Sequence, residues 1–184
     1  MQATYTKAEL EAQLSQIRQA VADSARAISA EHFDRRSGEN WSAAEYLAHL
    51  ILSVKPFAKA MGLPPERMAA LFAQADHPSR TYPDLVATYD ARLVEGIRAE
   101  DMPNVTPVNY RFPEGITDKQ IYLIDTWLES NERLLAALAA WTEADLDAYQ
   151  LPHPAAGMLT LREMCYFTIH HNTLHWRDIQ AAGA

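Results

Sequence analysis

The chain has 184 residues, of which 48% are hydrophobic and 22% charged, and this is typical of one soluble globular domain, here residues 1–184. Its 24 acidic and 16 basic side chains give a net charge of −8, which disfavours nucleic acid and anionic membranes as partners because both bind basic surfaces. A single cysteine, a polar N-terminus and the lack of an apolar run long enough to span a bilayer together predict a cytoplasmic protein.

Capping signals recur along the chain and indicate where helices begin. In a capping box, a Ser or Thr is followed three residues later by Glu or Gln, and the two side chains satisfy backbone N–H groups at a helix start. Such boxes begin at Thr6, Ser42, Thr117 and Thr160, and Thr81 is a looser fifth start. With the apolar periodicity, these signals predict helices over residues 6–33, 42–61, 81–100, 117–140 and 160–181.

The segments between these helices are expected to be connections. Residues 62–80 begin with Gly-Leu-Pro-Pro, which ends the second helix, and could hold a short helix at 65–75. Residues 101–116 contain three prolines and one glycine and are expected to form a loop. Residues 141–159 link the fourth helix to the last. The pattern predicts an all-α fold, a four-helix bundle with an additional connecting helix.

The last predicted helix carries two histidines one turn apart, His171 and His175. Residues four apart lie above one another on a helix surface, so both imidazoles can reach one metal ion. His49 lies in an apolar stretch of the second helix, and helix packing could bring it beside them. Three nitrogen ligands that leave one position open are typical of catalytic zinc. Each of these histidines could instead be a surface or packing residue, and spacing alone leaves both interpretations open.

Two carboxylates lie close in sequence to these histidines, and each has two interpretations. Glu45 precedes His49 by one turn and could act as a general base. It could also complete the capping box with Ser42, which is the favoured interpretation. Asp178 follows His175 by three residues and could orient its imidazole. An exposed carboxylate near the helix end is favoured for Asp178.

The remaining histidines are not expected to share a metal ion. His170 projects about 100° away from His171 on the helix and is expected to pack between helices. His153 lies in a proline-flanked loop, where it could line the mouth of a pocket. His32 and His77 are expected at the surface.

Two motifs carry a resemblance to a known family. One is Trp41-Ser-x-x-Glu-Tyr-Leu-x-His49-Leu, and the other is His153-Pro-Ala-Ala-Gly-Met-Leu-Thr-Leu-Arg-Glu followed by His171-x-x-x-His175. With them, nearly the whole chain resembles the DinB/YfiT-like superfamily. This resemblance implies an up-down-down-up bundle in which His49, His171 and His175 bind a divalent metal. Family members often continue with Arg-Gly-Gln, whereas this chain has Trp-Arg-Asp, so no role of that glutamine is carried over.

Three candidate functions remain after the resemblance. The first is a metal-dependent enzyme in which Zn²⁺ or Ni²⁺ activates water or a low-molecular-weight thiol such as bacillithiol or mycothiol. Similar proteins include thiol-dependent transferases and isomerases, and hydrolase activity is attributed to others. The second is a non-catalytic metal- or ligand-binding protein of the stress response. The third is an interaction bundle whose histidines are incidental.

These functions differ in what they require of the structure. An enzyme needs a solvent-connected cavity beside the metal, with room for a thiol and an electrophile. A binding protein needs the metal site but no such room, and an interaction bundle needs neither. The expected partners are a small-molecule substrate and, as in many family members, a second copy of the chain in a homodimer.

Overall fold

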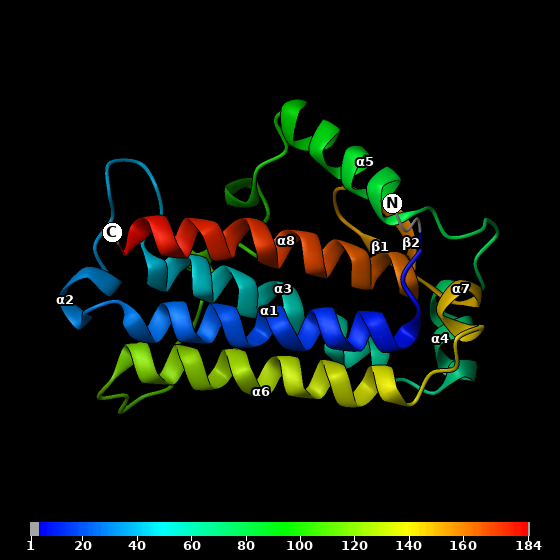
Figure 1. The fold of residues 1–184 in the computed structure, drawn as a ribbon, viewed down its shortest axis with the longest axis horizontal. Helices are drawn as coiled ribbons and strands as arrows, with labels where there is room; N and C mark the ends of the chain where they lie inside the picture. The colour runs from blue at the N-terminus through cyan, green and yellow to red at the C-terminus, as the bar shows by residue number, and fades with distance from the viewer. Residues whose placement is uncertain (1–3, 184) are drawn as a thin grey trace.

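Four long helices make up the bundle in this computed structural model, which describes residues 4–183. They are α1 (Lys7–Ala27), α3 (Ala43–Met61), α6 (Lys119–Ala139) and α8 (Leu161–Ala182). Figure 1 shows α1 and α8 running in one direction and α3 and α6 in the other. Each of α1 and α3 packs against both α6 and α8. The chain therefore forms the all-α, up-down-down-up bundle that was expected.

Three of the four predicted capping boxes are present with both of their hydrogen bonds. They pair Thr6 with Glu9, Ser42 with Glu45 and Thr160 with Glu163, and they begin α1, α3 and α8. The Thr81 hydroxyl also accepts a backbone hydrogen bond, as the cap of α5 (Tyr82–Val94). These side chains satisfy N–H groups that the first helical turn leaves without partners.

The predicted box at Thr117 is wrong. Asp118 caps α6 instead and accepts a backbone hydrogen bond within the first turn. Gln120, the expected second member of the box, donates to the backbone carbonyls of Ala25, at 2.7 Å, and Ile28, at 2.8 Å. Those carbonyls lie at the C-terminal end of α1. Gln120 therefore connects α6 to α1 and does not cap α6, as the local sequence pattern had predicted it would.

Two helices are shorter than predicted. The helix expected over 6–33 breaks at Ile28 and Ser29, which are both extended, and resumes as α2 (Ala30–Phe33). The helix expected over 81–100 ends at Val94. Gly96 follows with a φ of 97°, in the left-handed region that favours glycine and turns the chain out of the helix.

The connection between α3 and α6 runs across one end of the bundle and then along one side. It contains α4 (Pro65–Phe72), α5 and two 3₁₀ helices, η1 (Ala99–Asp101) and η2 (Pro107–Asn109). α4 matches the short helix expected within residues 62–80. α5 packs against α8 from outside the four-helix bundle, as Figure 1 shows.

A small hairpin, which the sequence did not predict, lies between α6 and α8. After α7 (Asp145–Ala148), strands β1 (Gln150–His153) and β2 (Gly157–Thr160) pair antiparallel. Their register sets His153 opposite Gly157 and Gln150 opposite Thr160, the cap of α8. The hairpin therefore leads directly into α8 and holds His153 beside it.

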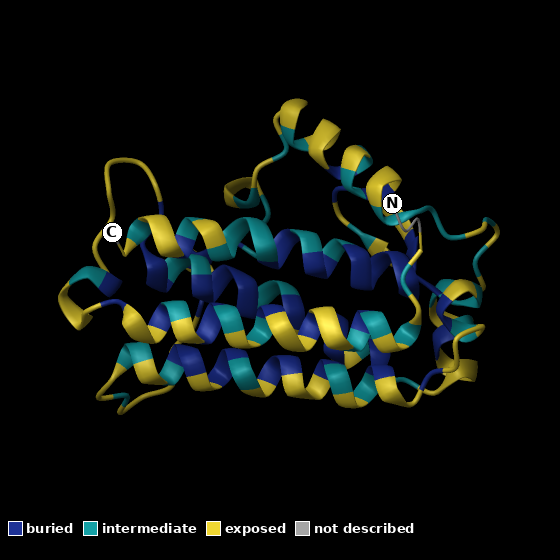
Figure 2. Cartoon of the chain, viewed as in Figure 1, coloured by how far each residue is buried: buried dark blue, intermediate teal, exposed yellow. Residues whose placement is uncertain are grey.

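Burial follows the packing of the four helices. In Figure 2 the sides of the helices that face one another are buried, and the outward sides alternate between intermediate and exposed. Trp127, Tyr166 and Phe33 are among the largest side chains with almost no exposed surface. Within residues 4–183, no helix has the length and apolar character needed to cross a membrane.

Candidate metal centre

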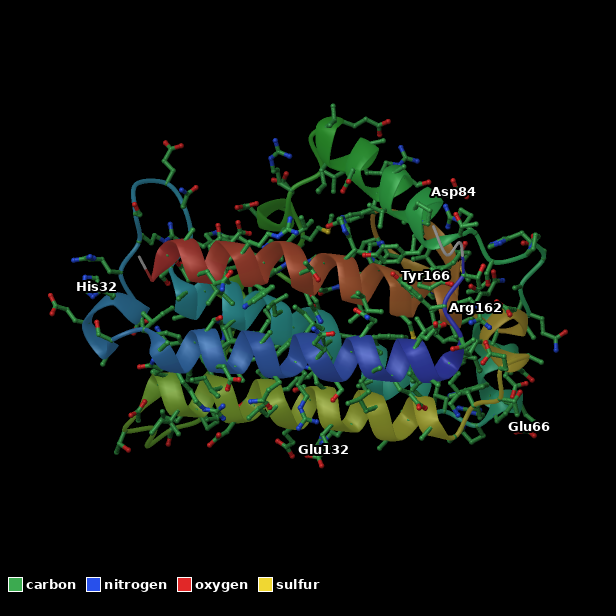
Figure 3. All side chains as sticks on the ribbon, in the orientation of Figure 1. His32, Glu66, Asp84, Glu132, Arg162 and Tyr166 are labelled. Carbon is green, nitrogen blue, oxygen red and sulfur yellow. The ribbon has the colours of Figure 1, made fainter. Side chains whose placement is uncertain are left out.

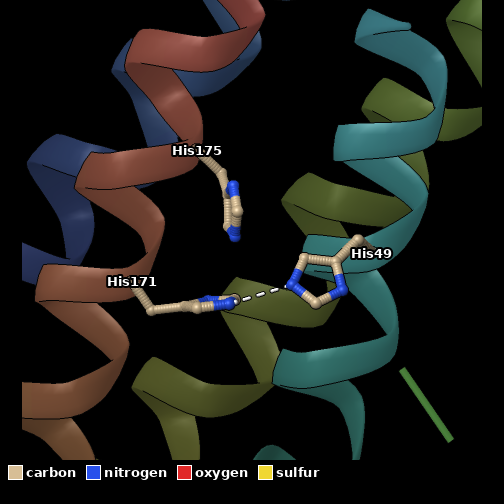
Figure 4. A group of neighbouring side chains, drawn as sticks. All are labelled: His49, His171 and His175. Atoms are coloured by element: carbon tan, nitrogen blue, oxygen red, sulfur yellow. Dashed lines mark hydrogen bonds between the residues drawn. The ribbon is translucent and has the colours of Figure 1, made fainter. Parts of the chain in front are cut away.

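Three histidines from two helices meet inside the bundle. His49 comes from α3, and His171 and His175 come from successive turns of α8. One ring nitrogen from each lies within 4.8 Å of the other two, and the Nε2 atoms of His49 and His171 are 2.9 Å apart. Figure 4 shows the three rings turned toward one another. The structure thus brings together the three residues chosen from the sequence, here called the three-histidine cluster.

Two of these rings are oriented by acceptors on the far side. His49 donates from Nδ1 to the backbone carbonyl of Val105, at 2.8 Å, and His175 donates from Nδ1 to Asp178 Oδ2, at 2.9 Å. A carbonyl or a carboxylate can only accept, so in the neutral ring the proton lies on Nδ1 and Nε2 keeps its lone pair. Metal-binding histidines are usually held in this way by a second hydrogen bond.

Burial keeps His49 and His171 neutral. It lowers the pKa of His49 to about 4 and, with the neighbouring histidines, holds the pKa of His171 well below its usual value. His49 is 2% exposed and His171 is 4% exposed, and a charged ring at such a position loses its hydration. Both rings therefore lack the second proton near pH 7. A neutral imidazole is the form that can bind a metal.

The cluster opens onto a cavity of about 660 Å³, which all three histidines line. This volume falls within the range of sites for small molecules. Its wall is formed by side chains from the segment before α3, from α3, α4 and α5, from the segment after α5, and from the hairpin and α8. Most are apolar and include Leu52, Phe57, Phe72, Leu93, Ile97, Met102 and Phe167. A molecule in this cavity can therefore lie against the three-histidine cluster.

Glu45 is engaged outside the cluster. Its carboxylate accepts a hydrogen bond from the Ser42 backbone N–H, at 2.9 Å, and forms an ion pair with Arg36. Burial would raise the pKa of Glu45, but the bonds from Arg36 and Ser42 outweigh burial and lower it. Glu45 is also not among the residues that line the cavity. The favoured capping role is present, and the general-base role stays a prediction.

Asp178 orients the imidazole of His175, which was the less favoured of the two sequence-based interpretations. Its side chain is partly exposed, yet it accepts the hydrogen bond from His175. His170, as expected, faces away from the cluster and packs between helices, where its Nε2 lies 2.9 Å from Asp90 Oδ1 on α5. His32 lies at the end of the bundle opposite Arg162, as Figure 3 shows. His153 lines the cavity from the hairpin.

Two residues of the site had no place in the sequence-based hypothesis. Val105 acts through a backbone carbonyl, which any residue possesses, so the sequence carries no signal for it. Asn172 is fully buried and lines the cavity, and neither polar atom of its carboxamide has a hydrogen-bond partner among residues 4–183. In the sequence, Asn172 could have been noticed as a polar residue that lies between the two histidines of the His171–His175 motif.

Comparison with known proteins identifies a family. A family model described as the DinB superfamily matches residues 13–179, a range that contains the three-histidine cluster and all of α3 and α6. No curated protein and no solved structure matches the chain.

Proposed function

The chain belongs to the DinB superfamily, and on this premise we propose that it binds a divalent metal through His49, His171 and His175. One observation carries the proposal. Ring nitrogens of two buried histidines and one partly exposed histidine converge from two helices, and His49 and His175 each donate a hydrogen bond from Nδ1 that orients the ring. This set of three imidazoles fits Zn²⁺ or Ni²⁺, both of which accept nitrogen ligands.

The cavity supports an enzyme rather than a storage site. The three-histidine cluster would hold a divalent cation, whose Lewis acidity would lower the pKa of a thiol or of water. The chain provides the space, because the cavity reaches the three histidines. Trp41 packs on His49 with ring centroids 5.2 Å apart, and Tyr46 packs on His175 at 5.5 Å. These aromatic rings and the apolar wall keep bulk water away from the reacting groups, which strengthens electrostatic interactions there.

A thiol fits the site better than water as the group to be ionised. The two carboxylates near the cluster in sequence, Glu45 and Asp178, already have protein partners. Glu45 also lies outside the cavity, and Asp178 is directed to His175 rather than to a proton donor in the cavity. A thiol with a pKa of about 8.5 ionises far more readily than water, whose pKa is about 15.7. We therefore favour a transferase or isomerase that uses a low-molecular-weight thiol, with a hydrolase as the alternative.

Metal analysis tests the first part of this proposal. Elemental mass spectrometry of the untagged protein should find about one divalent metal ion per chain. His49→Ala and His175→Ala should each lose that ion while circular dichroism shows unchanged helicity. His170→Ala is the matched control, because His170 is next to His171 but faces Asp90. Metal that is absent from the wild type, or that remains in His49→Ala, contradicts the three-histidine site.

Activity assays test the second part. The metal-loaded protein is mixed with a panel of low-molecular-weight thiols and 1-chloro-2,4-dinitrobenzene, and thioether formation is followed by absorbance. We expect metal-dependent transfer that His175→Ala abolishes and His170→Ala retains. Hydrolysis of 4-nitrophenyl acetate without thiol transfer would point to the hydrolase. A protein that holds its metal but catalyses neither reaction would be a binding protein, and the enzyme proposal would fail.

A further inference from the structure

His153 presents a hydrogen-bond donor to the cavity. Its Nδ1 accepts the backbone N–H groups of Ala155, at 3.2 Å, and Ala156, at 3.1 Å, in the turn between β1 and β2. A ring nitrogen that accepts hydrogen bonds carries no proton, so the proton of this imidazole is on Nε2. Within residues 4–183, Nε2 has no hydrogen-bond partner of its own. The turn therefore fixes one tautomer, whose Nε2–H is left for another molecule.

The ring of His153 is held in place by aromatic neighbours. It lies against Phe167, with centroids 4.1 Å apart, and edge-on to Tyr89, at 6.2 Å. All three side chains line the cavity, and Phe167 in turn stacks on His171, at 5.0 Å. A molecule that contacts His153 is thus one aromatic ring away from the three-histidine cluster.

The polar groups in the buried wall are neutral. Burial lowers the pKa of His153 to about 4 and raises the pKa of Tyr89 to about 12, so both are uncharged near pH 7. The carboxamide of Asn172 is neutral at any pH, and both of its polar atoms lack a partner. A buried polar group without a partner is costly, so a ligand or water that bonds to it is favoured.

The charged residues of the cavity oppose an anionic ligand. Glu39, Glu100 and Asp178 are acidic, and Arg98 is the one base among the described residues that line it. Arg98 donates to backbone carbonyls of its own segment, those of Leu93 and Ile97. The protein side chains alone therefore offer an anion no buried positive partner.

We propose that this cavity binds a neutral, largely apolar molecule that carries a carbonyl oxygen, and that His153 Nε2–H donates a hydrogen bond to that oxygen. This inference rests on the proposed function in one respect only, since it places the ligand beside the three-histidine cluster. The apolar wall of the cavity would contact the apolar part of the ligand. The fixed Nε2–H of His153 would donate to its carbonyl oxygen.

Three probes with one apolar body test the ligand class. They are 2-acetylnaphthalene, which has a carbonyl, 2-ethylnaphthalene, which has no acceptor, and 2-naphthoate, which is charged. Equilibrium dialysis near pH 7 measures their binding to the metal-free protein, so that the carboxylate gains nothing from a metal. We expect the ketone to bind about fivefold more tightly than the ethyl compound, the effect of one net hydrogen bond. The naphthoate should bind more weakly than both.

His153→Asn separates the donor from the fold of the hairpin. The asparagine oxygen can accept the N–H of Ala155 in an Asx-turn, so the turn is kept, but its shorter amide does not reach the position of Nε2. The ketone should then bind no better than the ethyl compound. His170→Gln, changed outside the cavity, should keep the wild-type preference. Metal content should be unchanged in both variants, because neither residue belongs to the cluster.

Several results would overturn this inference. They are equal binding of ketone and ethyl compound to the wild type, a ketone preference that survives in His153→Asn, tightest binding of the naphthoate, or no binding of the ketone at all. These readings do not depend on metal. If elemental analysis finds none but His153→Asn removes the ketone preference, the proposed metal function fails and the ligand class stands.

Discussion

Two polar clusters are built around the same helix, α8, and they differ in how completely their polar groups are hydrogen-bonded. One is the network at its N-terminal end, formed by Arg162 and Glu163 and their partners and called here the α8 start network. The other is the three-histidine cluster, two and more turns further along. Figure 3 shows Arg162 and Tyr166 at the end of the bundle where α1 also begins.

The α8 start network is closed. The guanidinium of Arg162, whose side chain is 3% exposed, donates to the carboxylates of Glu143 and Asp147 and to the backbone carbonyl of Tyr5. Glu163, which has no exposed surface, accepts from the backbone and side chain of Arg80 and completes the cap of α8. Every charge has a partner within the protein, so this network ties the chain segments together.

The three-histidine cluster is open. The Nε2 atoms of His49 and His171 have only each other as partners, at 2.9 Å, and the neighbouring carboxamide of Asn172 has none among residues 4–183. Groups so placed cost free energy in the absence of a ligand. Completeness is therefore the difference between the two clusters. A closed network fixes the fold, whereas the open cluster leaves the ring nitrogens that the proposed metal would bind.

The largest expected effect breaks the closed network. Arg162→Ala leaves the carbonyl of Tyr5 without its donor and separates Glu143 and Asp147 from their cation. We expect the free energy of unfolding to fall by about 3 kcal/mol, the lower end for breaking a buried pair, because both carboxylates are about half exposed. Urea unfolding of the metal-free protein measures this change.

The matched control is Arg133→Ala, which removes an exposed pair with Glu129 on the surface of α6. Exposed pairs contribute less than about 1 kcal/mol. If the two arginine variants lose equal stability, the α8 start network does not hold the segments together.

The pH dependence of stability should separate two buried histidines that line the cavity, His49 and His153, from Glu163 of the α8 start network. In the folded protein, burial lowers the pKa of His49 and of His153 to about 4, below the usual value of about 6.5. The unfolded chain therefore takes up their protons first, and stability present above about pH 6.5 is lost as the pH falls toward 4. The pKa of Glu163 is lowered from 4.5. The contribution of the Glu163 carboxylate to the free energy of unfolding is therefore present above about pH 4.5 and is lost as the pH falls below that value.

Unfolding of the metal-free protein by urea across this pH range checks the two windows. Between pH 6.5 and 4, the free energy of unfolding should fall less steeply with falling pH in His153→Asn than in the wild type. The difference between the two slopes should correspond to about one bound proton. Glu163→Gln should differ from the wild type in its slope only below pH 4.5. Parallel curves for all three proteins would show that neither group is shifted as described.

The smallest expected effect concerns the hydrogen bond that orients His175. Asp178→Asn keeps an acceptor near Nδ1 but removes its charge. Such partners of a metal ligand typically change metal affinity by about 10-fold, so competition with a chromophoric zinc chelator should show about tenfold weaker binding. Asp125→Asn, an exposed change on α6, is the control. Unchanged affinity in Asp178→Asn would mean that the bond does not support metal binding.

The sequence by itself determined the features that depend on neighbouring residues. Capping boxes at Thr6, Ser42 and Thr160 predicted where three of the bundle helices begin, because both partners lie within one turn. The spacing of His171 and His175 was equally local, since four residues make about one turn of helix. The apolar neighbours of His49 were enough to indicate it as a candidate metal ligand. The family resemblance then implied that His49, His171 and His175 bind the same metal.

The tertiary structure decided the features that join distant parts of the chain. His49 meets His171 across 122 residues, and its ring is turned by a carbonyl at Val105 that no side-chain pattern reveals. Gln120 bonds to the backbone of α1 and not to the predicted cap of α6. The hairpin that holds His153 forms in a segment that was expected to be only a connection. Local hydrogen bonds are encoded by adjacent residues, whereas a cavity exists only after separate segments have packed around it.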